Sequence, residues 1–213
     1  MTIVAVAGTG TGVGKTYVGA ALVRALRARG FVVAARKPVQ SFASDDPSTD
    51  ADVLAVASGE EPKLVCPAAR WLRVPIAPPM AADALGLPPF TIADLAAEVR
   101  ATAPPDALVL VETAGGVRSP IADDGDSAAL IDALGPALVV LVADAGLGTI
   151  NVVRLSVEAL APHPVVVYLN NFDHGWKLHV RNADWLRTRE GLEVVTDIEA
   201  LTTRVEPLAR ARG

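Results

Sequence analysis

The stretch GTGTGVGKT, Gly8 to Thr16, follows directly after the apolar run TIVAVA and sets the expected fold. A loop so rich in glycine can turn its backbone amides inward, because glycine tolerates positive φ and adds no side chain to the concavity. Such a loop can hold an anion. A strand before the loop and a helix beginning at Lys15 complete the setting of a phosphate-binding P-loop. The alternative is a glycine-rich turn that binds no ligand.

The P-loop motif predicts a role for each of its residues. The amides from Gly12 to Lys15 surround the phosphates, the Lys15 ammonium reaches the β- and γ-phosphates, and the Thr16 hydroxyl binds magnesium. One detail departs from the usual form, since the interval from Gly8 to Gly14 is one residue longer. The loop residues expected to bind the nucleotide are Thr11, Gly12, Val13, Gly14, Lys15, Thr16 and Tyr17.

The chain has 213 residues, of which 51% are hydrophobic, and this fits a single domain spanning residues 1–213. The net charge of −5 excludes a global basic field, so we expect neither nucleic acid nor an anionic membrane as a partner. The single cysteine, Cys66, excludes an internal disulfide and is expected to be buried or half-buried. The sequence shows no signal-peptide pattern and no unbroken apolar stretch of about 18 residues, so we expect a cytoplasmic protein.

Short apolar, β-branched runs alternate along the chain with segments of helical period. Continuous hydrophobicity in these runs favours strands covered on both faces. The repeated strand-helix order predicts an α/β fold like that of P-loop NTPases, an open and mostly parallel sheet with helices on both faces. The predicted strands start at Thr2, Phe31, Ala107, Ala137, Val165 and Leu192, and the predicted helices cover residues 16–30, 51–59, 91–101, 126–135, 150–161 and 180–191. Loops are expected at 41–47 and 77–90.

Three polar segments lie at or after the ends of predicted strands, at the rim where ligands bind in such folds. KPVQS contains Lys37 and Ser41, and its ordinary interpretation is a strand that ends in a solvated lysine. STDAD offers Asp50 and Asp52 at a helix start, where either carboxylate could bind a metal or simply cap the helix. VLVETAGG places Glu112 at the end of an apolar strand, and a buried carboxylate is costly unless it is paired.

In this order, the segments GTGTGVGKT, KPVQS, STDAD and VETAGG resemble the dethiobiotin synthetase family, whose P-loop has the same longer interval. The resemblance covers residues 2 to about 171. It implies Lys15, Lys37 and Ser41 as catalytic residues, with Lys37 and Ser41 also contacting the substrate. It implies Thr16, Asp50 and Glu112 as magnesium ligands, with Asp52 as the alternative to Asp50. Asn170 resembles the asparagine that contacts adenine in that family, with Asn171 as its alternative.

The run GLGTIN, Gly146 to Asn151, resembles the segment with which the same family binds the carboxylate of its substrate across a dimer interface. Free amides and the positive end of a helix dipole attract a carboxylate, although an ordinary loop and helix cap would look the same. The residues implied for this contact are Gly148, Thr149, Ile150 and Asn151. VPIAPP, from Val74, is similar to a proline-spaced loop that lines the substrate pocket. A homodimer follows from the resemblance.

The chemistry that the resemblance implies is an ATP-dependent carboxylation with Mg²⁺. An amine of 7,8-diaminononanoate takes up CO2 to form a carbamate, which attacks the γ-phosphate to give a carbamic-phosphoric anhydride. The second amine then closes the ring of dethiobiotin, an intermediate of biotin synthesis, and expels phosphate. Magnesium held by carboxylates, together with two lysines, suits phosphoryl transfer, which depends mainly on positioning and charge stabilisation.

Some features depart from the family pattern, and two other functions stay open. Thr113 stands where the family has glycine, and LEVVTDIEAL, from Leu192, replaces a strand ending in Ile-Pro, so the nucleotide preference is undetermined. One alternative is a P-loop amidoligase of the cobyrinate type, but the sequence contains no glutaminase domain. The other is a partitioning-type switch ATPase, but the loop has Thr9 and Thr11 and lacks the second lysine usual in such proteins. The histidines His163, His174 and His179 are predicted to be surface or loop residues.

Overall fold

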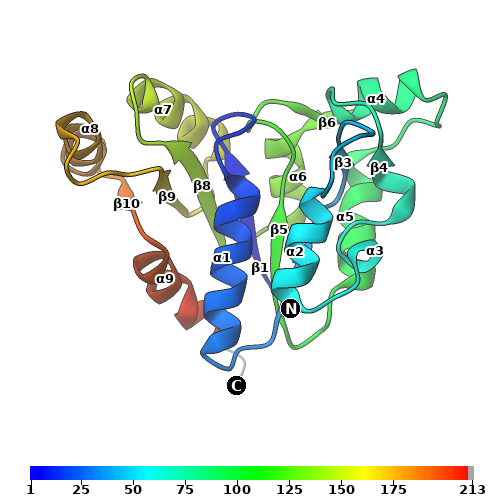
Figure 1. Ribbon diagram of the computed structural model, residues 1–213, viewed down its shortest axis with the longest axis horizontal. Helices are drawn as coiled ribbons and strands as arrows, with labels where there is room; N and C mark the ends of the chain where they lie inside the picture. Colours follow the sequence, from blue (N-terminus) through cyan, green and yellow to red (C-terminus); the bar gives the residue numbers. More distant parts are fainter. Residues whose placement is uncertain (211–213) are drawn as a thin grey trace.

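The computed structural model describes residues 1–210, and within them the central sheet has six strands. Their spatial order is β10-β9-β8-β1-β5-β2, and all neighbours run parallel (Figure 1). The strands are β1 (Thr2–Gly8), β2 (Val33–Arg36), β5 (Leu108–Glu112), β8 (Leu138–Asp144), β9 (Val165–Asn170) and β10 (Glu193–Val195). Each begins within two residues of the predicted start or lies inside the predicted run, so the six predicted strands and their parallel arrangement are confirmed.

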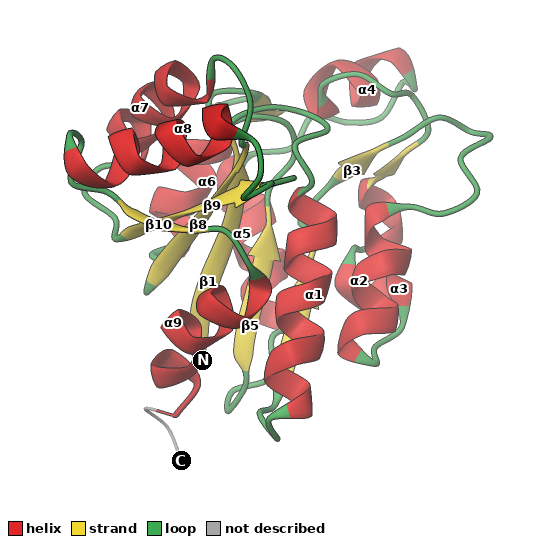
Figure 2. Ribbon diagram, turned by 60° about the vertical axis from the view of Figure 1, so that its left-hand side comes forward, coloured by secondary structure: helices red, strands yellow, loops and turns green. Residues whose placement is uncertain are grey.

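Both faces of the sheet are covered by helices, as predicted (Figures 1 and 2). Successive side chains of a strand point to opposite faces, and in β1 both sets are buried: Val4 and Val6 in one cluster, Ile3 and Ala5 in two others. The first face carries α1 (Lys15–Ala28), α2 (Asp50–Ser58), α3 (Pro62–Val65) and α9 (Ile198–Arg210). The second carries α5 (Ile92–Thr102), α6 (Ser127–Leu134), α7 (Thr149–Leu160) and α8 (Lys177–Thr188).

Three α-helices within residues 1–210 were not predicted: the single turn α3, α4 and α9. The expected loop at 77–90 contains α4 (Pro78–Ala84), which starts with proline at its first helical position, where the missing N–H is harmless. Helix α9 follows β10 and buries Leu201 and Val205 against α1, with Leu208 partly buried. Their spacing of four and three residues is a helical period that the sequence already carries. The expected loop at 41–47 is a loop from Phe42 onward.

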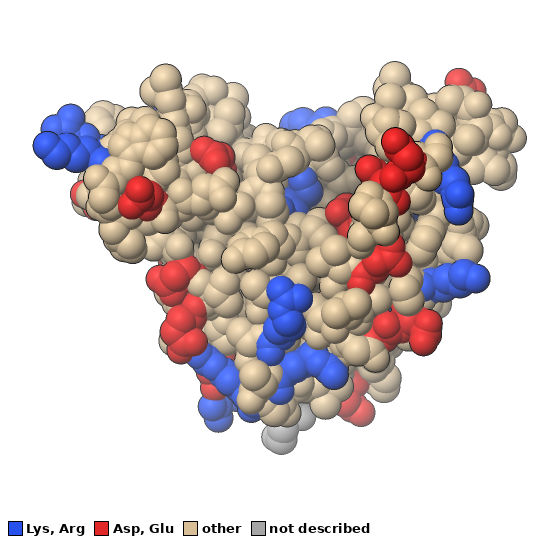
Figure 3. Space-filling view, viewed as in Figure 1, with Lys and Arg blue, Asp and Glu red and all other residues tan. Residues whose placement is uncertain are grey.

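Two short ladders extend the rim of the molecule beyond the central sheet. The strand β3 (Gln40–Ser41) pairs in parallel with β4 (Trp71–Leu72), and β6 (Pro120–Ala122) pairs with β7 (Gly125–Asp126). In Figure 1, β3, β4 and α4 lie on one side of the glycine loop, and α7 and α8 lie on the other. The space-filling view shows a hollow between these two raised parts (Figure 3).

The structure also tests the burial predicted for Cys66 and for His179. Cys66 is fully buried, which confirms its prediction, and burial raises the pKa of its thiol to about 12. The prediction for His179 is wrong, because this side chain is 4% exposed and accepts a hydrogen bond from the Asp173 amide.

None of the helices within residues 1–210 combines the length and the apolar character needed to cross a membrane. Acidic and basic side chains are intermixed on the face seen in Figure 3.

Candidate active site

The glycine loop connects β1 to α1 and borders a cleft of about 540 Å³. Gly12 and Gly14 adopt positive φ, at 76° and 95°, and this curls the loop over the start of α1. The Lys15 ammonium donates to the Gly10 carbonyl at 2.9 Å, inside the loop. The P-loop residues that line the cleft are Thr11, Gly12, Gly14, Lys15 and Thr16. Tyr17 is 62% exposed and Val13 is partly buried, and neither contributes to the cleft wall.

Asn170 packs against the glycine loop from the end of β9. Its side-chain amide donates to the Val13 carbonyl at 3.0 Å. A Cβ atom added at Gly14 would lie 2.1 Å from the Asn170 Nδ2 atom. The rival residue, Asn171, instead donates to Asp144 Oδ2 at 3.2 Å and points away from the loop contact. Of the two candidates for contacting the base, the structure therefore brings Asn170 to the P-loop.

Replacing Gly14 with Ala is expected to lower the affinity for ATP by about tenfold or more. The new side chain combines positive φ with a clash against Asn170, and a strained position of this kind costs about 1–3 kcal/mol. Titration with a fluorescent ATP analogue measures the change. The matched control is Gly86→Ala, because Gly86 also has positive φ but no atom within 4 Å of an added Cβ. Equal ATP affinity in Gly14→Ala and the unaltered protein would contradict the expectation.

Lys37 lies at the centre of a buried charge cluster. Its ammonium is 2.6 Å from Glu112 Oε1 and 2.8 Å from Asp50 Oδ2, and it donates to the Thr113 carbonyl at 3.2 Å. Lys37 is 1% exposed and Glu112 is fully buried, so the solvated-lysine interpretation of KPVQS is wrong. The three contacts match the three donors of an ammonium group, which leaves none of them unsatisfied. Three segments distant in sequence thus meet at one point.

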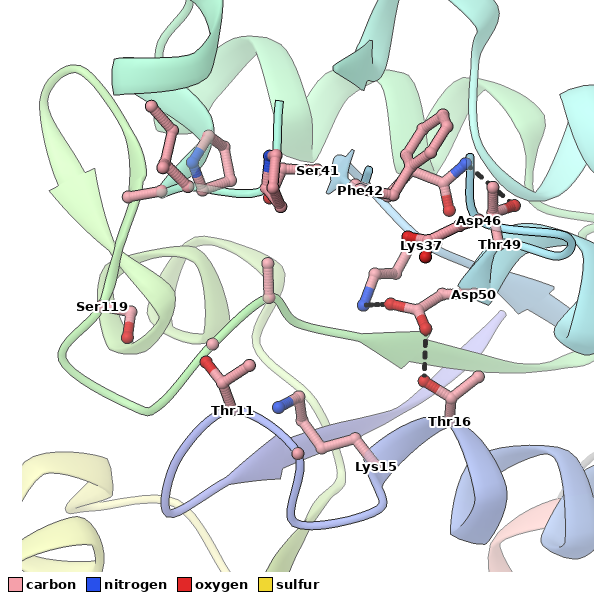
Figure 4. A pocket seen from close by; sticks show the side chains of 18 of the residues that line it. Thr11, Lys15, Thr16, Lys37, Ser41, Phe42, Asp46, Thr49, Asp50 and Ser119 are labelled. Atoms are coloured by element: carbon pink, nitrogen blue, oxygen red, sulfur yellow. Dashed lines mark hydrogen bonds and ion pairs between the residues drawn. The ribbon is translucent and has the colours of Figure 1, made fainter. Parts of the chain in front are cut away.

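Thr16 joins the same cluster from the first turn of α1. Its hydroxyl lies 2.8 Å from Asp50 Oδ1 and 2.9 Å from Glu112 Oε1 (Figure 4). Within the described residues, Glu112 Oε2 is buried and has no hydrogen-bond partner. Two carboxylates and a hydroxyl are oxygen ligands of the kind that Mg²⁺ accepts. The unpartnered Glu112 Oε2 atom has its lone pairs available to bind such an ion.

Asp50 and Asp52, the two candidates for the metal site, have different partners at the start of α2. The Asp52 carboxylate accepts from the Thr49 amide at 2.8 Å, and the Thr49 hydroxyl accepts from the Asp52 amide at 3.3 Å. This reciprocal capping box occupies Asp52 at the start of α2. Asp50, not Asp52, contacts Thr16 and Lys37. Residues 1–210 contain no group of three or more His, Cys, Asp or Glu side chains around a common point, so water or phosphate would complete a magnesium shell.

The mutual contacts decide which groups of the cluster carry charge. Burial, together with the nearby Lys37 ammonium, lowers the pKa of Lys15 to about 8. Burial alone would lower the pKa of Lys37, but the Glu112 and Asp50 carboxylates outweigh it and raise that pKa. Burial disfavours the Asp50 carboxylate, yet Lys37 and Thr16 outweigh burial, and the pKa of Asp50 falls below its ordinary value. Lys37 and Asp50 therefore stay charged at neutral pH.

The opposite wall of the cleft carries Ser41 and the proline-rich segment. Figure 4 shows Ser41 across the cleft from Lys15, whereas Ser119 lies at the side, near Thr11. Part of the predicted VPIAPP loop also lines the cleft, and its lining residues are Pro75, Ile76, Ala77 and Pro78. Sequence reasoning missed five polar lining residues, namely Gln40, Asp46, Ser48, Thr49 and Ser119. The first was available, because Gln40 lies inside KPVQS, whereas the position of Ser119 after VETAGG carried no signal.

The segment GLGTIN forms the loop before α7, with Gly148 at the helix cap. Thr149 is 3% exposed, and its hydroxyl has no hydrogen-bond partner among residues 1–210. Leu147 is 92% exposed. The four predicted residues Gly148, Thr149, Ile150 and Asn151 do not line the cleft that contains Lys37 and Ser41. One copy of the chain therefore does not bring the two parts of the predicted substrate site together.

A second cavity, of about 500 Å³, lies between the glycine loop and α7. It shares Thr11, Ser119 and Pro120 with the main cleft, and α7 contributes Val152, Leu155 and Ser156. The two cavities are therefore neighbours that meet at the three shared residues.

A parallel sheet with a glycine loop, Lys15 and Thr16 at the start of α1 defines an α/β protein of the P-loop nucleotide-binding class. Residues 2–207 match the family described as an AAA domain. Curated relatives named ATP-dependent dethiobiotin synthetase BioD include those of Caulobacter sp. (strain K31), 43% identical over 73% of this chain and 68% of the relative, and Anaeromyxobacter dehalogenans, 45% identical over 73% and 69%. The chain belongs to the dethiobiotin synthetase family.

Solved structures of other proteins have a similar fold. The signal recognition particle receptor FtsY from Elizabethkingia anophelis matches 98% of this chain and 65% of its own, with a TM-score of 0.56 and 14% identity. Apo McdA of Cyanthece matches 96% of this chain and 90% of its own, with a TM-score of 0.52 and 14% identity. At such low identity these structures establish the P-loop fold alone.

Proposed function

We propose that this chain closes the ring of dethiobiotin from 7,8-diaminononanoate and CO2, with ATP as the phosphate donor. The observation that carries the proposal is the buried Lys37 ammonium, held between Asp50 and Glu112 beside the P-loop of a dethiobiotin synthetase family member. A lysine desolvated in this way offers a fixed positive charge next to the place where a γ-phosphate would lie.

The reaction has three steps. One amine of the substrate bonds to the carbon of CO2, which gives a carbamate and releases a proton. A carbamate oxygen attacks the γ-phosphorus of ATP, ADP leaves, and a carbamic-phosphoric anhydride forms. The second amine attacks the anhydride carbonyl, loses a proton and expels inorganic phosphate, so that both nitrogens share one carbonyl group.

In this proposal, Lys15, Lys37 and Ser41 bind different parts of the reacting molecules. Lys15 and the amides from Gly12 to Lys15 hold the phosphates of ATP. Lys37 exchanges one of its three present partners for the carbamate oxygens beside the γ-phosphate and neutralises charge as the phosphorus is attacked. Ser41, on the facing wall, donates to the carbamate or accepts from the amine.

Magnesium fits the oxygen donors of this cluster. Thr16, Asp50 and Glu112 would hold it, and the unpartnered Glu112 Oε2 supports that assignment. When bound, Mg²⁺ neutralises phosphate charge and orients the β- and γ-phosphates. Asn170 holds the P-loop through Val13, and its free carbonyl oxygen is available to the base.

The substrate carboxylate is assigned to Gly148, Thr149, Ile150 and Asn151 of a second copy of the chain. The buried, unpartnered Thr149 hydroxyl at the start of α7 supports an anion there, because it adds a donor to the free amides of the helix. The exposed side chains of Leu147 and Leu155 beside it support an apolar contact between copies. A homodimer would complete the substrate site that a single copy leaves divided.

The amidoligase and the switch ATPase receive less support. The family membership favours ring closure, and the cleft opens onto a wall of Ser41 and prolines that a nucleotide switch would not need. No observation on the site favours either alternative specifically.

The test is phosphate release from ATP and Mg²⁺ with bicarbonate, in the presence and absence of 7,8-diaminononanoate, with the organic product followed by mass. We expect release that depends on the diamine and matches, one to one, a product with one carbonyl across both nitrogens. Release that ignores the diamine and yields no new product would overturn the proposal.

A further inference from the structure

Gln40 has both ends of its side-chain amide bound to the start of α2. Its Oε1 atom accepts from the Ala51 amide at 3.0 Å, and its Nε2 atom donates to the Thr49 hydroxyl at 3.3 Å. The residue is 2% exposed and lies on β3, directly before Ser41 in the cleft wall. A buried amide with both ends satisfied has one defined orientation.

These bonds complete a cap that α2 cannot make alone. The first amides of a helix have no partner inside the helix. The Thr49 hydroxyl covers the Asp52 amide and donates to the Asp52 carboxylate at 2.8 Å, so it cannot also reach Ala51. Gln40 satisfies the Ala51 amide instead. The first turn of α2 is thus held from a different element, β3.

Asp50 lies in sequence between Thr49 and Ala51, the two residues that Gln40 binds. Its carboxylate contacts Thr16 and Lys37 in the cleft. The Asp50 side chain is 44% exposed, whereas that of Glu112 is fully buried. Burial therefore keeps Glu112 in place, but the position of Asp50 depends on the backbone at the start of α2.

We propose that Gln40 is a positioning residue that holds Asp50 at the magnesium site. It also couples that site to the strand that carries Ser41, so that the substrate wall and the metal ligand move together. The inference rests on the proposed function, in which Asp50 binds the metal. Side chains that orient metal ligands through such contacts typically change metal affinity by 10- to 100-fold when they are lost.

Gln40→Met keeps the length of the side chain and removes both hydrogen bonds. With ADP present, we expect its dissociation constant for Mn²⁺, measured by electron paramagnetic resonance, to rise about tenfold. The Mg²⁺ concentration for half-maximal turnover should rise in parallel, with a smaller change in the KM for the diamine. Gln40→Glu keeps the acceptor for Ala51 and should show a smaller shift. The control is Ser58→Ala, which removes a buried hydroxyl from the far end of α2 and should leave metal affinity unchanged.

The variant Asp50→Asn distinguishes the metal-binding role of Asp50 from the positioning role of Gln40. We expect it to weaken Mn²⁺ binding, and the double variant with Gln40→Met to add little more, because both changes remove one interaction. Unchanged Mn²⁺ affinity in Asp50→Asn would overturn the metal role of Asp50 and with it the inference. A shift in Asp50→Asn with none in Gln40→Met and Gln40→Glu, or a lower melting temperature alone, would overturn the inference and leave the proposed function standing.

Discussion

Lys37→Met is expected to reduce dethiobiotin formation by about a hundred- to a thousandfold, while ATP affinity changes by less than about tenfold. The reason is position: the ammonium lies between Asp50 and Glu112, whereas Lys15 is the lysine of the glycine loop. Its charge is therefore needed when the carbamate attacks, more than when ATP binds. Steady-state rates and a nucleotide titration measure the two effects separately.

Lys37→Met should also lower the stability of the fold, because Lys37 neutralises two carboxylates. Removing one partner of a buried ion pair typically costs about 3–5 kcal/mol, because the other charge is left uncompensated. We expect a lower melting temperature in Lys37→Met, and part of the loss should be recovered with Mg²⁺. Lys63→Met, at an exposed lysine on α3, is the control and should change neither rate nor stability. Full turnover in Lys37→Met, or a loss of ATP binding as large as the loss of rate, would place Lys37 in another role.

Glu112→Gln is expected to raise the Mg²⁺ concentration for half-maximal turnover by about 10- to 100-fold. The amide is close in size to the carboxylate, but it removes the negative charge that faces Thr16 and Lys37 and offers the metal one neutral oxygen. Lys37 keeps its contact with Asp50, so the fold should survive. A magnesium titration of the initial rate measures the effect.

The matched control for Glu112→Gln is Glu60→Gln. Glu60 pairs with the buried Arg36 at 2.8 Å and accepts from the Ala35 amide, and it does not line the cleft. Its replacement should lower stability without changing the magnesium response. If both variants respond to magnesium like the unaltered protein, Glu112 does not belong to the metal shell.

The central fold could be predicted because its signals are local. A strand covered on both faces needs an unbroken apolar run, and all six such runs became strands of one sheet. Three helices were not predicted, and α3 is only a single turn of four residues, Pro62–Val65. The prolines of the segment before Phe90 suggested a loop, although Pro78 suits the first position of α4. Helix α9 contains Pro207, a residue that ordinarily ends or kinks a helix.

The candidate site was predictable as a set of residues but not as a geometry. Motifs named Lys15, Thr16, Lys37 and Glu112, but nothing in the sequence separated Asp50 from Asp52. The capping box decides between them, because a carboxylate that accepts from the Thr49 amide cannot also reach Thr16. Likewise Tyr17 follows the loop in sequence but points into solvent, since the helix turns it away from the cleft.

The sequence by itself determined the six central strands and the main helices between them, the phosphate loop and the family, because each of these depends on residues that are neighbours along the chain. Only the tertiary structure decided that Lys37 is buried between Asp50 and Glu112, that Gln40 holds the start of α2, and that the GLGTIN segment lies outside the cleft. Those facts depend on distances between segments far apart in sequence, such as Lys37 and Glu112, which are 75 residues apart. Packing of the helices on the sheet sets such distances, and no local pattern encodes them.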